Sequence, residues 1–377
     1  MIPDALPEVL VIGGGPAGSS AALLLARAGR RVTLVEREAG PHDKVCGEFI
    51  SHEAAAYLTA LGLDLRGLGA VAIRDVRLAG QGGVSHAALP FRALSLSRRR
   101  LDEALLGLAQ AAGVTLARGR RVKALDCCGE AWRAALDGGE TLEARAAFLA
   151  TGKHDLKGRK RQAGLQNDLV AFKMHYRLTP AQAAGLAGAV ELGLFPGGYA
   201  GLEPIEDGLA NLCLLARQSA LGDGPAWPAV LAALRSGCPL LDRRLEGAQP
   251  LWPKPLAIAA IPYGHVQQAS AGVWRLGDQA AVIPSFAGDG VAIALHSAHA
   301  AAQAYLAGVG PDAFQARLAR DLRLQVTGAT LLSHGLVRPW AQGLIAAATR
   351  AQPWLLTATA RRTRISGKVL NATCSTA

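Results

Sequence analysis

Three glycines near the start of the chain have the spacing of a turn that holds a dinucleotide. Gly13, Gly15 and Gly18 form G-x-G-x-x-G within "VLVIGGGPAGSSAALLLARAGRRVTLVERE". Gly13 permits a tight turn, Gly15 lets the backbone approach a pyrophosphate, and Gly18 allows a helix and a strand to pack closely. Glu36 follows Gly18 by 36 − 18 = 18 residues, close to the spacing of a carboxylate that bonds a ribose 2′-hydroxyl. Because Glu36 would repel a 2′-phosphate, NADP is disfavoured at this turn, and NAD or FAD remains.

The segments around these glycines predict the elements that position them. Residues 9–12 and 32–35 are short apolar runs typical of buried parallel strands, and residues 19–30 between them predict a helix rich in Ala and Leu. The N-terminus of this helix would face the pyrophosphate, because its free N–H groups and its dipole favour anions. The neighbouring residues Pro16, Ala17 and Arg37 are predicted to contact the same nucleotide.

Composition limits the class of protein. The chain has 377 residues, half of them apolar, and a formal charge of +11, which is typical of a folded α/β protein with ample core. Basic runs at 97–100, 157–161 and 361–364 lack the aromatic company of a nucleic-acid surface, so no nucleic-acid partner is expected. The six cysteines include no C-x-x-C pair, so no metal site is expected. We see no signal peptide and no transmembrane stretch, and we expect a cytoplasmic protein with free thiols.

A second motif lies far along the chain, in "VWRLGDQAAVIPSFAGDGVAIALHSAHAAAQAYL". It resembles the second signature of the FAD-binding fold shared by aromatic hydroxylases and geranylgeranyl reductases. The resemblance implies FAD as the cofactor, with Asp278 of the Gly277-Asp278 pair bonding the ribityl chain. It also implies that the helix beginning near Gly290 and Val291 points its N-terminus at the flavin pyrimidine, where the helix dipole can stabilise a reduced flavin anion. Pro284 and Gly288, in the loop before this helix, complete the predicted contacts.

Further segments carry the same resemblance. "RRRLDEALL" resembles the family stretch whose arginine, here Arg98, lies near the cofactor, and Val122 corresponds to a valine that meets the adenine through its backbone. "AAFLATG" resembles the strand that closes the nucleotide domain with Thr151-Gly152. The hydroxylases then carry an Asp-Gly pair linked to FAD and NADPH, whereas this chain has "TGKHDLKGRKR". NADH or NADPH could still be the electron donor, although this chain lacks the Asp-Gly pair that is linked to NADPH in the hydroxylases.

The stretch "KVCGEFIS" separates the two families. Geranylgeranyl reductases have a cysteine-glycine pair beside the flavin ring, which Cys46-Gly47 resembles, whereas the hydroxylases place an arginine in this region. Cys46 could tune the ring, contact substrate, or be an inert buried thiol. Glu48 is the nearest titratable candidate for proton transfer, and Lys44 is predicted to contact the cofactor.

The middle of the chain predicts a β-layer. Residues 169–178 alternate between apolar and polar, and residues 189–216 predict three strands separated by the turns "PGG" and "EDG". In the family, such a sheet roofs the flavin and forms the substrate cavity. The residues that could line it are His175, Tyr199, Asn211 and Cys213. A shift of one residue in register would change which of them do so.

We therefore predict an α/β protein with a Rossmann-like, three-layer ββα FAD-binding domain, an interleaved antiparallel β-sheet substrate domain and a helical C-terminal tail. The expected boundaries are, for the FAD domain, 1–75, 95–160 and 265–310; for the substrate domain, 76–94 and 161–264; and for the tail, 311–377. Trp340, Trp354 and "RRTR" in the tail could cap the substrate cavity or make a transient contact with a membrane surface, although packing against the body is the simpler expectation.

The resemblance implies an FAD-dependent oxidoreductase acting on a small-molecule substrate. Architecture and length favour a flavin monooxygenase of a small, largely apolar compound. Cys46-Gly47 and the missing Asp-Gly pair favour the alternative, a geranylgeranyl-reductase-like enzyme that moves hydride between flavin and a C–C bond. A flavin-binding protein without catalysis of its own is the third hypothesis.

Overall fold

The first of two large sheets is the parallel sheet that the sequence predicts. The structure, a computed structural model, describes residues 7–221 and 226–365. Five parallel strands lie in the order β17–β10–β1–β2–β6. Their bounds are β1 Val9–Ile12, β2 Val32–Glu36, β6 Thr115–Arg118, β10 Ala146–Leu149 and β17 Trp274–Arg275. The order places β1 at the centre, so the glycine turn that follows it opens at the middle of the sheet edge.

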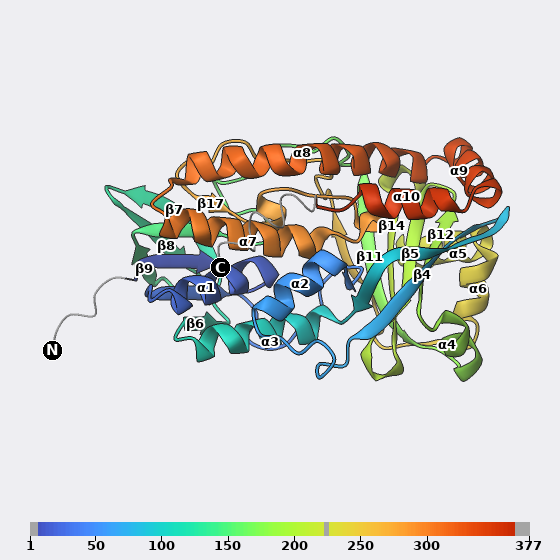
Figure 1. Ribbon diagram of the computed structural model, residues 1–377, viewed down its shortest axis with the longest axis horizontal. Helices are drawn as coiled ribbons and strands as arrows, with labels where there is room; N and C mark the ends of the chain where they lie inside the picture. Colours follow the sequence, from blue (N-terminus) through green and yellow to red (C-terminus); the bar gives the residue numbers. More distant parts are fainter. Residues whose placement is uncertain (1–6, 222–225, 366–377) are drawn as a thin grey trace.

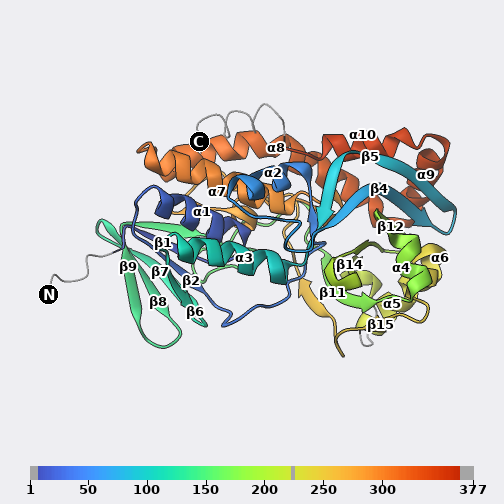
Figure 2. The ribbon, with the colours of Figure 1, turned by 60° about the horizontal axis from the view of Figure 1, so that its bottom comes forward.

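This sheet lies between two other layers (Figure 2). Val9 and Val11 pack toward the helices on one face, whereas Leu10 and Ile12 pack toward a small antiparallel sheet on the other. The helices are α1 Pro16–Arg27, α3 Arg98–Ala111 and α7 Gly290–Leu306, and the small sheet contains β7 Val122–Cys128, β8 Ala131–Leu136 and β9 Thr141–Ala144. The alternation within β1 produces the predicted ββα layering, because both faces of a parallel strand are covered.

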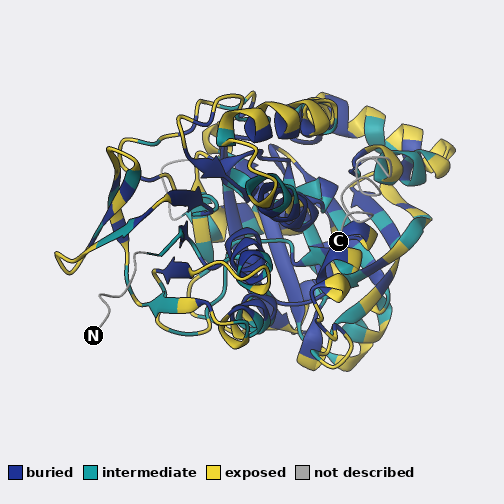
Figure 3. Ribbon diagram, turned by 60° about the vertical axis from the view of Figure 1, so that its left-hand side comes forward, coloured by how far each residue is buried: buried dark blue, intermediate teal, exposed yellow. Residues whose placement is uncertain are grey.

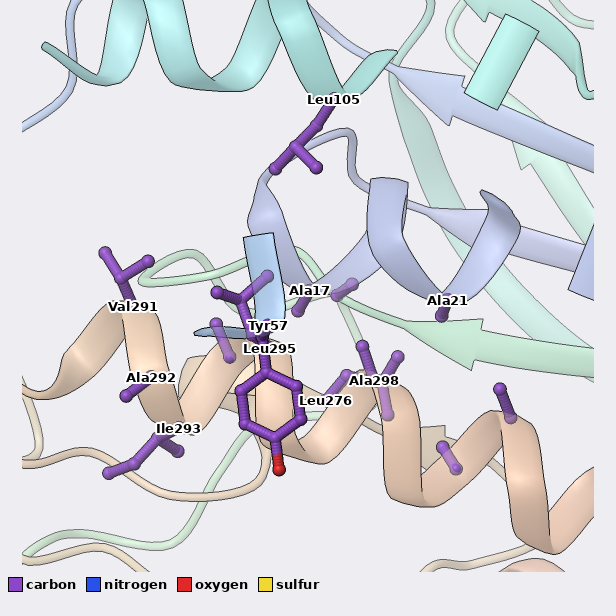
Figure 4. Packing of buried hydrophobic residues seen from close by; sticks show 14 of the residues in the cluster. Ala17, Ala21, Tyr57, Leu105, Leu276, Val291, Ala292, Ile293, Leu295 and Ala298 are labelled. Atoms are coloured by element: carbon purple, nitrogen blue, oxygen red, sulfur yellow. The ribbon is translucent and has the colours of Figure 1, made fainter. Parts of the chain in front are cut away.

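Small residues let the helices approach one another closely. Ala17 and Ala21 of α1 face Leu295 and Ala298 of α7 (Figure 4). A Cβ on Gly18 would lie 1.9 Å from the carbonyl oxygen of Gly13, so this position of α1 tolerates glycine alone. The helix begins at Pro16, three residues earlier than predicted, because proline suits the first helical position.

The second sheet is larger and mixes strands from both halves of the chain. Its order is β15–β11–β14–β13–β12–β4–β5–β3, with β16 also paired to β11. All pairs are antiparallel except β4 with β12, which is parallel. The bounds are β3 Phe49–Ile50, β4 Val71–Gly80, β5 Gly83–Ser95, β11 Leu169–Arg177, β12 Ala189–Phe195, β13 Gly198–Pro204, β14 Ala210–Arg217, β15 Gln249–Pro250 and β16 Leu256–Ala259.

The two faces of this sheet have different partners. Phe172, Met174 and Tyr176 of β11 belong to a core shared with the helices on the outer face. These helices are α4 Pro180–Leu186, α5 Ala226–Gly237 and α6 Pro239–Leu245. Lys173 and His175 therefore point to the opposite face, as the alternation predicts, and are buried there. A further helix, α2 His52–Ala60, packs against α7 and β5.

Three helices end the described part of the chain: α8 Pro311–Leu336, α9 Pro339–Ala351 and α10 Trp354–Arg362. In Figure 1, α8 runs along one side of both domains, while α9 and α10 lie over β4 and β5. Trp340 and Trp354 do not pack against the body, which corrects that expectation. They are 68% and 60% exposed, because α9 and α10 bury other residues, such as Ala341 and Leu356. In residues 7–221 and 226–365, no helix has both the length and the apolar character to cross a bilayer.

Candidate functional site

A cavity of about 840 Å³ runs from the glycine turn of the parallel sheet to the inner face of the second sheet. Every residue that the sequence predicts to contact the cofactor lines this cavity, except Gly18 and Pro284. Gly18 lies behind the turn, where it packs on Gly13. The predicted cofactor residues, spread over more than 270 positions of sequence, are thus brought together around one space.

The turn end of the cavity is built to hold an anion. Gly15 is the N-cap of α1, no side chain caps the helix, and its first N–H groups remain available. A Cβ on Gly15 would lie 3.4 Å from Nη2 of Arg98 and 3.9 Å from Nζ of Lys44. Asp102 holds both cations, at 2.8 Å from Arg98 Nε and 3.0 Å from Lys44 Nζ. Burial alone would raise the pKa of Asp102, but Arg98 and then Lys44 hold it below its usual value. Two cations share one carboxylate, so the site keeps a net positive charge beside Gly15.

A buried carboxylate lies beside the turn. Oε2 of Glu36 accepts the N–H of Gly14 at 2.6 Å, and Oε1 accepts the N–H of Glu38 at 3.0 Å. These bonds fix the carboxylate at the end of β2, where it lines the cavity. Each oxygen keeps a lone pair for another donor, so Glu36 can bond a ribose hydroxyl as predicted.

The opposite part of the cavity combines a second carboxylate with a second helix N-terminus. Asp278 follows Gly277, which adopts a positive φ of 56°, and its Oδ2 lies 3.6 Å from Nζ of Lys153. At the start of α7, a Cβ on Gly290 would meet no described atom within 4 Å. Asp289, the N-cap, does not cap the helix, because its side chain pairs with Arg364 at 3.1 Å. The N–H groups of α7 therefore stay available to a ligand in the cavity.

These observations fit FAD. A pyrophosphate suits the cationic turn at Gly15, hydroxyl chains suit Glu36 and Asp278, and a ring that gains negative charge on reduction suits the N-terminus of α7. The glycines at positions 15 and 290 leave open the space that the cofactor backbone and ring would need.

A buried ionic network lies where the cavity meets the second sheet. Glu48 is 1% exposed and has a positive φ of 64°. Its Oε1 accepts the backbone N–H of Arg98 at 2.8 Å and Nζ of Lys173 at 2.5 Å, and its Oε2 lies 2.8 Å from Nε2 of His175. Burial alone would raise the pKa of Glu48, but Lys173 and then His175 hold it below its usual value. Both carboxylate oxygens of Glu48 are engaged by these partners. Glu48 therefore links the two domains and is not a free base.

Sequence reasoning placed Lys173 on the inner face of the sheet but assigned it no role in the site. Its side chain is fully buried, and Nζ lies 3.9 Å from Oδ1 of Asp43 in addition to its contact with Glu48. Asp43, Glu48 and His175 offer three ligand atoms within 4.8 Å of one another. The Lys173 ammonium already supplies a positive charge to this cluster. Two features of the sequence could have indicated this role. Lys173 lies within a largely apolar strand, and it is two residues from His175, so both side chains lie on the same face of the strand.

The predicted substrate residues divide into one that lines the cavity and three that do not. Cys213 lines it, and burial raises the pKa of its thiol to about 12. His175 is turned toward Glu48 and packs on Trp252, with ring centroids 4.8 Å apart. Asn211 instead donates to the carbonyl oxygens of Cys46 and Gly47, at 3.1 Å and 2.9 Å, and so holds the cysteine-glycine turn.

Tyr199, the remaining predicted residue, lies within an apolar cluster and contacts Phe286 edge-on. Burial raises its pKa to about 12. Glu203, which the sequence did not suggest, lies opposite Asn211 on the neighbouring strand. It is 3% exposed, and neither of its oxygens has a hydrogen-bond partner among the described residues. Burial, followed by Glu48 and Cys46, raises the pKa of Glu203 well above the usual value.

Comparison with known proteins agrees with the site. Residues 7–152 match the family model FAD_binding_3, described as an FAD binding domain. The menaquinone reductase of Mycobacterium tuberculosis is 27% identical over 321 residues, covering 80% of this chain and 76% of that protein. The tryptophan 2-halogenase of Chondromyces crocatus is 28% identical over 325 residues, covering 78% and 60%.

Solved structures show the same architecture. The flavin-dependent brominase Bmp2 superposes with a TM-score of 0.74 at 20% identity, covering 95% of this chain and 93% of that one. The flavin-dependent halogenase CmlS gives 0.77 at 22% identity, covering 99% and 70%. The fold and the cavity define an FAD-dependent oxidoreductase. Within that class, the chain is similar to a menaquinone reductase, to a tryptophan 2-halogenase and, over 56 residues, to the 6-methylpretetramide 4-monooxygenase of Streptomyces rimosus.

Proposed function

We propose that this chain is an FAD-dependent reductase of a carbon–carbon double bond in an apolar substrate. The observation that carries the proposal is the chemistry of the cavity wall formed by the second sheet and its neighbouring loops. Ala171, Ile258, Ile261 and Val282 give this wall an apolar surface. Such a wall selects an apolar compound and excludes water from the reaction.

The titratable groups near this wall are neutral acids or paired carboxylates. Burial raises the pKa of Cys213 to about 12 and that of Tyr263 well above its usual value, so both stay protonated. Glu48 is bonded to Lys173 and His175, and Asp43 faces the same two residues. A phenol hydroxylase benefits from a free base that activates its substrate. The paired state of Asp43 and Glu48 therefore favours reduction over phenol oxygenation.

The comparisons support both a reductase and a halogenase: the two relatives cover 80% and 78% of the chain, and the superposed structures are a brominase and a halogenase. Cys46-Gly47, the feature that resembles geranylgeranyl reductases, adds weight to the reductase. Cys46 lines the cavity beside Arg98, and Asn211 fixes the carbonyl groups of the pair. The turn is thus a rigid part of the site.

When bound, reduced FAD supplies a hydride. The chain's own residues perform the remaining tasks. The apolar wall orients the double bond and keeps water out, the network around Glu48 fixes the two domains, and the Cys46 thiol holds a proton at Sγ for the second carbon. One hydride and one proton would add across the double bond, the thiolate left on Cys46 would regain its proton from solvent, and the two electrons would come from a reduced nicotinamide or a reductase protein.

An anaerobic turnover experiment tests this proposal. FAD-loaded protein, reduced chemically under argon, is mixed with quinones that carry isoprenoid chains and with simple isoprenoid alkenes. We expect the flavin to reoxidise without O2 and a product two hydrogens heavier by mass spectrometry. Cys46→Ala should lower turnover and retain FAD, whereas the exposed Cys127→Ala should change neither.

Monooxygenation is the second candidate, because the same apolar compartment would also protect an oxygenating species from water. Architecture and length also favour it. Product that contains oxygen from labelled O2, together with no reaction under argon, would refute the reductase and establish the oxygenase.

A further inference from the structure

The end of the chain has a one-sided charge. No Asp or Glu follows Asp321, whereas residues 322–377 contain seven Lys and Arg residues. This segment therefore supplies a large share of the net charge of +11. An acid-free basic segment is attracted to negatively charged surfaces and contains nothing that would repel them.

The same segment exposes large apolar side chains. We define the C-terminal surface as six residues of α8, α9 and α10: Leu324, Leu331, Leu332, Trp340, Leu344 and Trp354. Their exposed fractions range from 44% for Leu332 to 86% for Leu324. Leu324 and Leu331 lie two turns apart on one face of α8. Figure 3 shows exposed residues along the outer side of these helices.

Exposed arginines accompany these apolar residues. Arg338 lies two residues before Trp340, Arg350 lies in the last turn of α9, and Arg361 and Arg362 end α10. Tryptophan beside arginine is the combination found where proteins rest on the headgroup region of a bilayer.

The inner side of the same helices belongs to the substrate compartment. Leu336, Val337 and Leu356 are buried in one apolar cluster with Ile261 and Tyr263, which line the cavity. The C-terminal surface is thus separated from the cavity by the thickness of a helix layer. Figure 1 shows α9 and α10 covering the strands of the substrate domain.

We propose that the C-terminal surface docks on an anionic membrane surface, with Trp340, Trp354 and the leucines in the headgroup region and the arginines on the lipid phosphates. Because no described helix can cross a bilayer, the protein would lie on the membrane rather than span it. Docking does not depend on which reaction the flavin performs. Delivery of an apolar substrate from the bilayer to the cavity, in contrast, rests on the proposed function.

Vesicle flotation of the FAD-loaded protein tests the apolar part of the surface. We expect binding to phosphatidylcholine vesicles that contain phosphatidylglycerol. The double variant Trp340→Ser, Trp354→Ser should reduce the partition coefficient by about tenfold or more, since two interfacial anchors are lost. Leu251→Ser, which removes a residue 39% exposed directly after β15, is the matched control and should bind like the unaltered protein.

The basic part is tested in the same assay. Arg361→Glu, Arg362→Glu should weaken binding, whereas Arg66→Glu, at an exposed position outside this segment, should not. High salt should release the unaltered protein, because exposed charges are screened. Absorbance of bound FAD shows that each variant is folded. Equal binding to vesicles of pure phosphatidylcholine, or no binding at all, would overturn the proposal. If the protein does not bind vesicles but sediments as a dimer, and the tryptophan variant sediments as a monomer, the surface is an interface between two copies of the chain and the proposal is likewise overturned.

Discussion

Removing Lys173 should destabilise the protein strongly, because it leaves a buried carboxylate without its main counter-charge. Lys173→Met keeps most of the side-chain volume and deletes the ammonium that lies 2.5 Å from Oε1 of Glu48. The side chains of both residues are fully buried. Removing one partner of a buried ion pair lowers the free energy of unfolding by about 3–5 kcal/mol. We expect a loss near the upper end, since Asp43 loses the same cation.

The assay is urea unfolding followed by far-UV circular dichroism, with FAD content measured in parallel. Lys157→Met, an exposed lysine, is the control and should stay within about 0.5 kcal/mol of the unaltered protein. The double variant Lys173→Met, Glu48→Gln should lose less than the sum of its two single variants, because the unpaired charge is absent. Additive losses in this cycle would refute the electrostatic reasoning.

The loss should also depend on pH. In the unaltered protein the pKa of Glu48 is lowered, so its contribution is present above the ordinary value of 4.5 and is lost as pH falls below it. Without Lys173, burial dominates and raises the pKa of Glu48, so folding then favours the protonated form. The cost of Lys173→Met should therefore grow as pH rises from about 5 to about 8. A cost that is constant over this range would show that packing, not charge, explains the loss.

Three further outcomes follow from the structure. Asp278→Ala should weaken FAD by about 1.5–3 kcal/mol, the scale of a hydrogen bond to a charged group, while the exposed Asp126→Ala leaves it unchanged in a fluorescence titration. Glu203→Gln should raise the melting temperature at about pH 9 and leave it unchanged near pH 5. Because the pKa of Glu203 is raised in the folded protein, folding favours its protonated form. The free energy of unfolding therefore falls as pH rises in the unaltered protein, but not for this reason in the Glu203→Gln variant. Gly18→Ala should abolish soluble FAD-binding protein, because its Cβ would lie 1.9 Å from the carbonyl oxygen of Gly13; recovery of normal FAD content would contradict this.

The sequence predicted the parts of the fold that depend on local pattern. β1 has the predicted bounds, and the turns at Gly197 and at Asp207-Gly208 adopt the positive φ values that the motifs require. Alternation in residues 169–178 placed Lys173 and His175 on the inner face of the sheet. Glycine spacing and strand periodicity act over a few residues, so they can be recognised without the rest of the chain.

The buried network could not be predicted in the same way. Glu48 and Lys173 are 125 residues apart, and their contact depends on how two domains meet. The unpartnered state of Glu203 depends on the register between β13 and β14. Helical periodicity gave no reason to place Trp340 outside, because the face that α9 buries is decided by the sheet beneath it.

The interleaving of the two sheets has a consequence for synthesis on the ribosome. β10 ends at Leu149, but its partner β17 begins at Trp274 and the covering helix α7 ends at Leu306. At about 5–20 residues per second, the emerging chain would wait roughly 8–30 s for these elements. During that time the face of α1 that packs on α7 has no partner. If FAD binding requires both Gly15 and Gly290, as the sequence predicts, FAD would be captured only after α7 has left the ribosome, so a product truncated before α7 would emerge colourless and prone to aggregate.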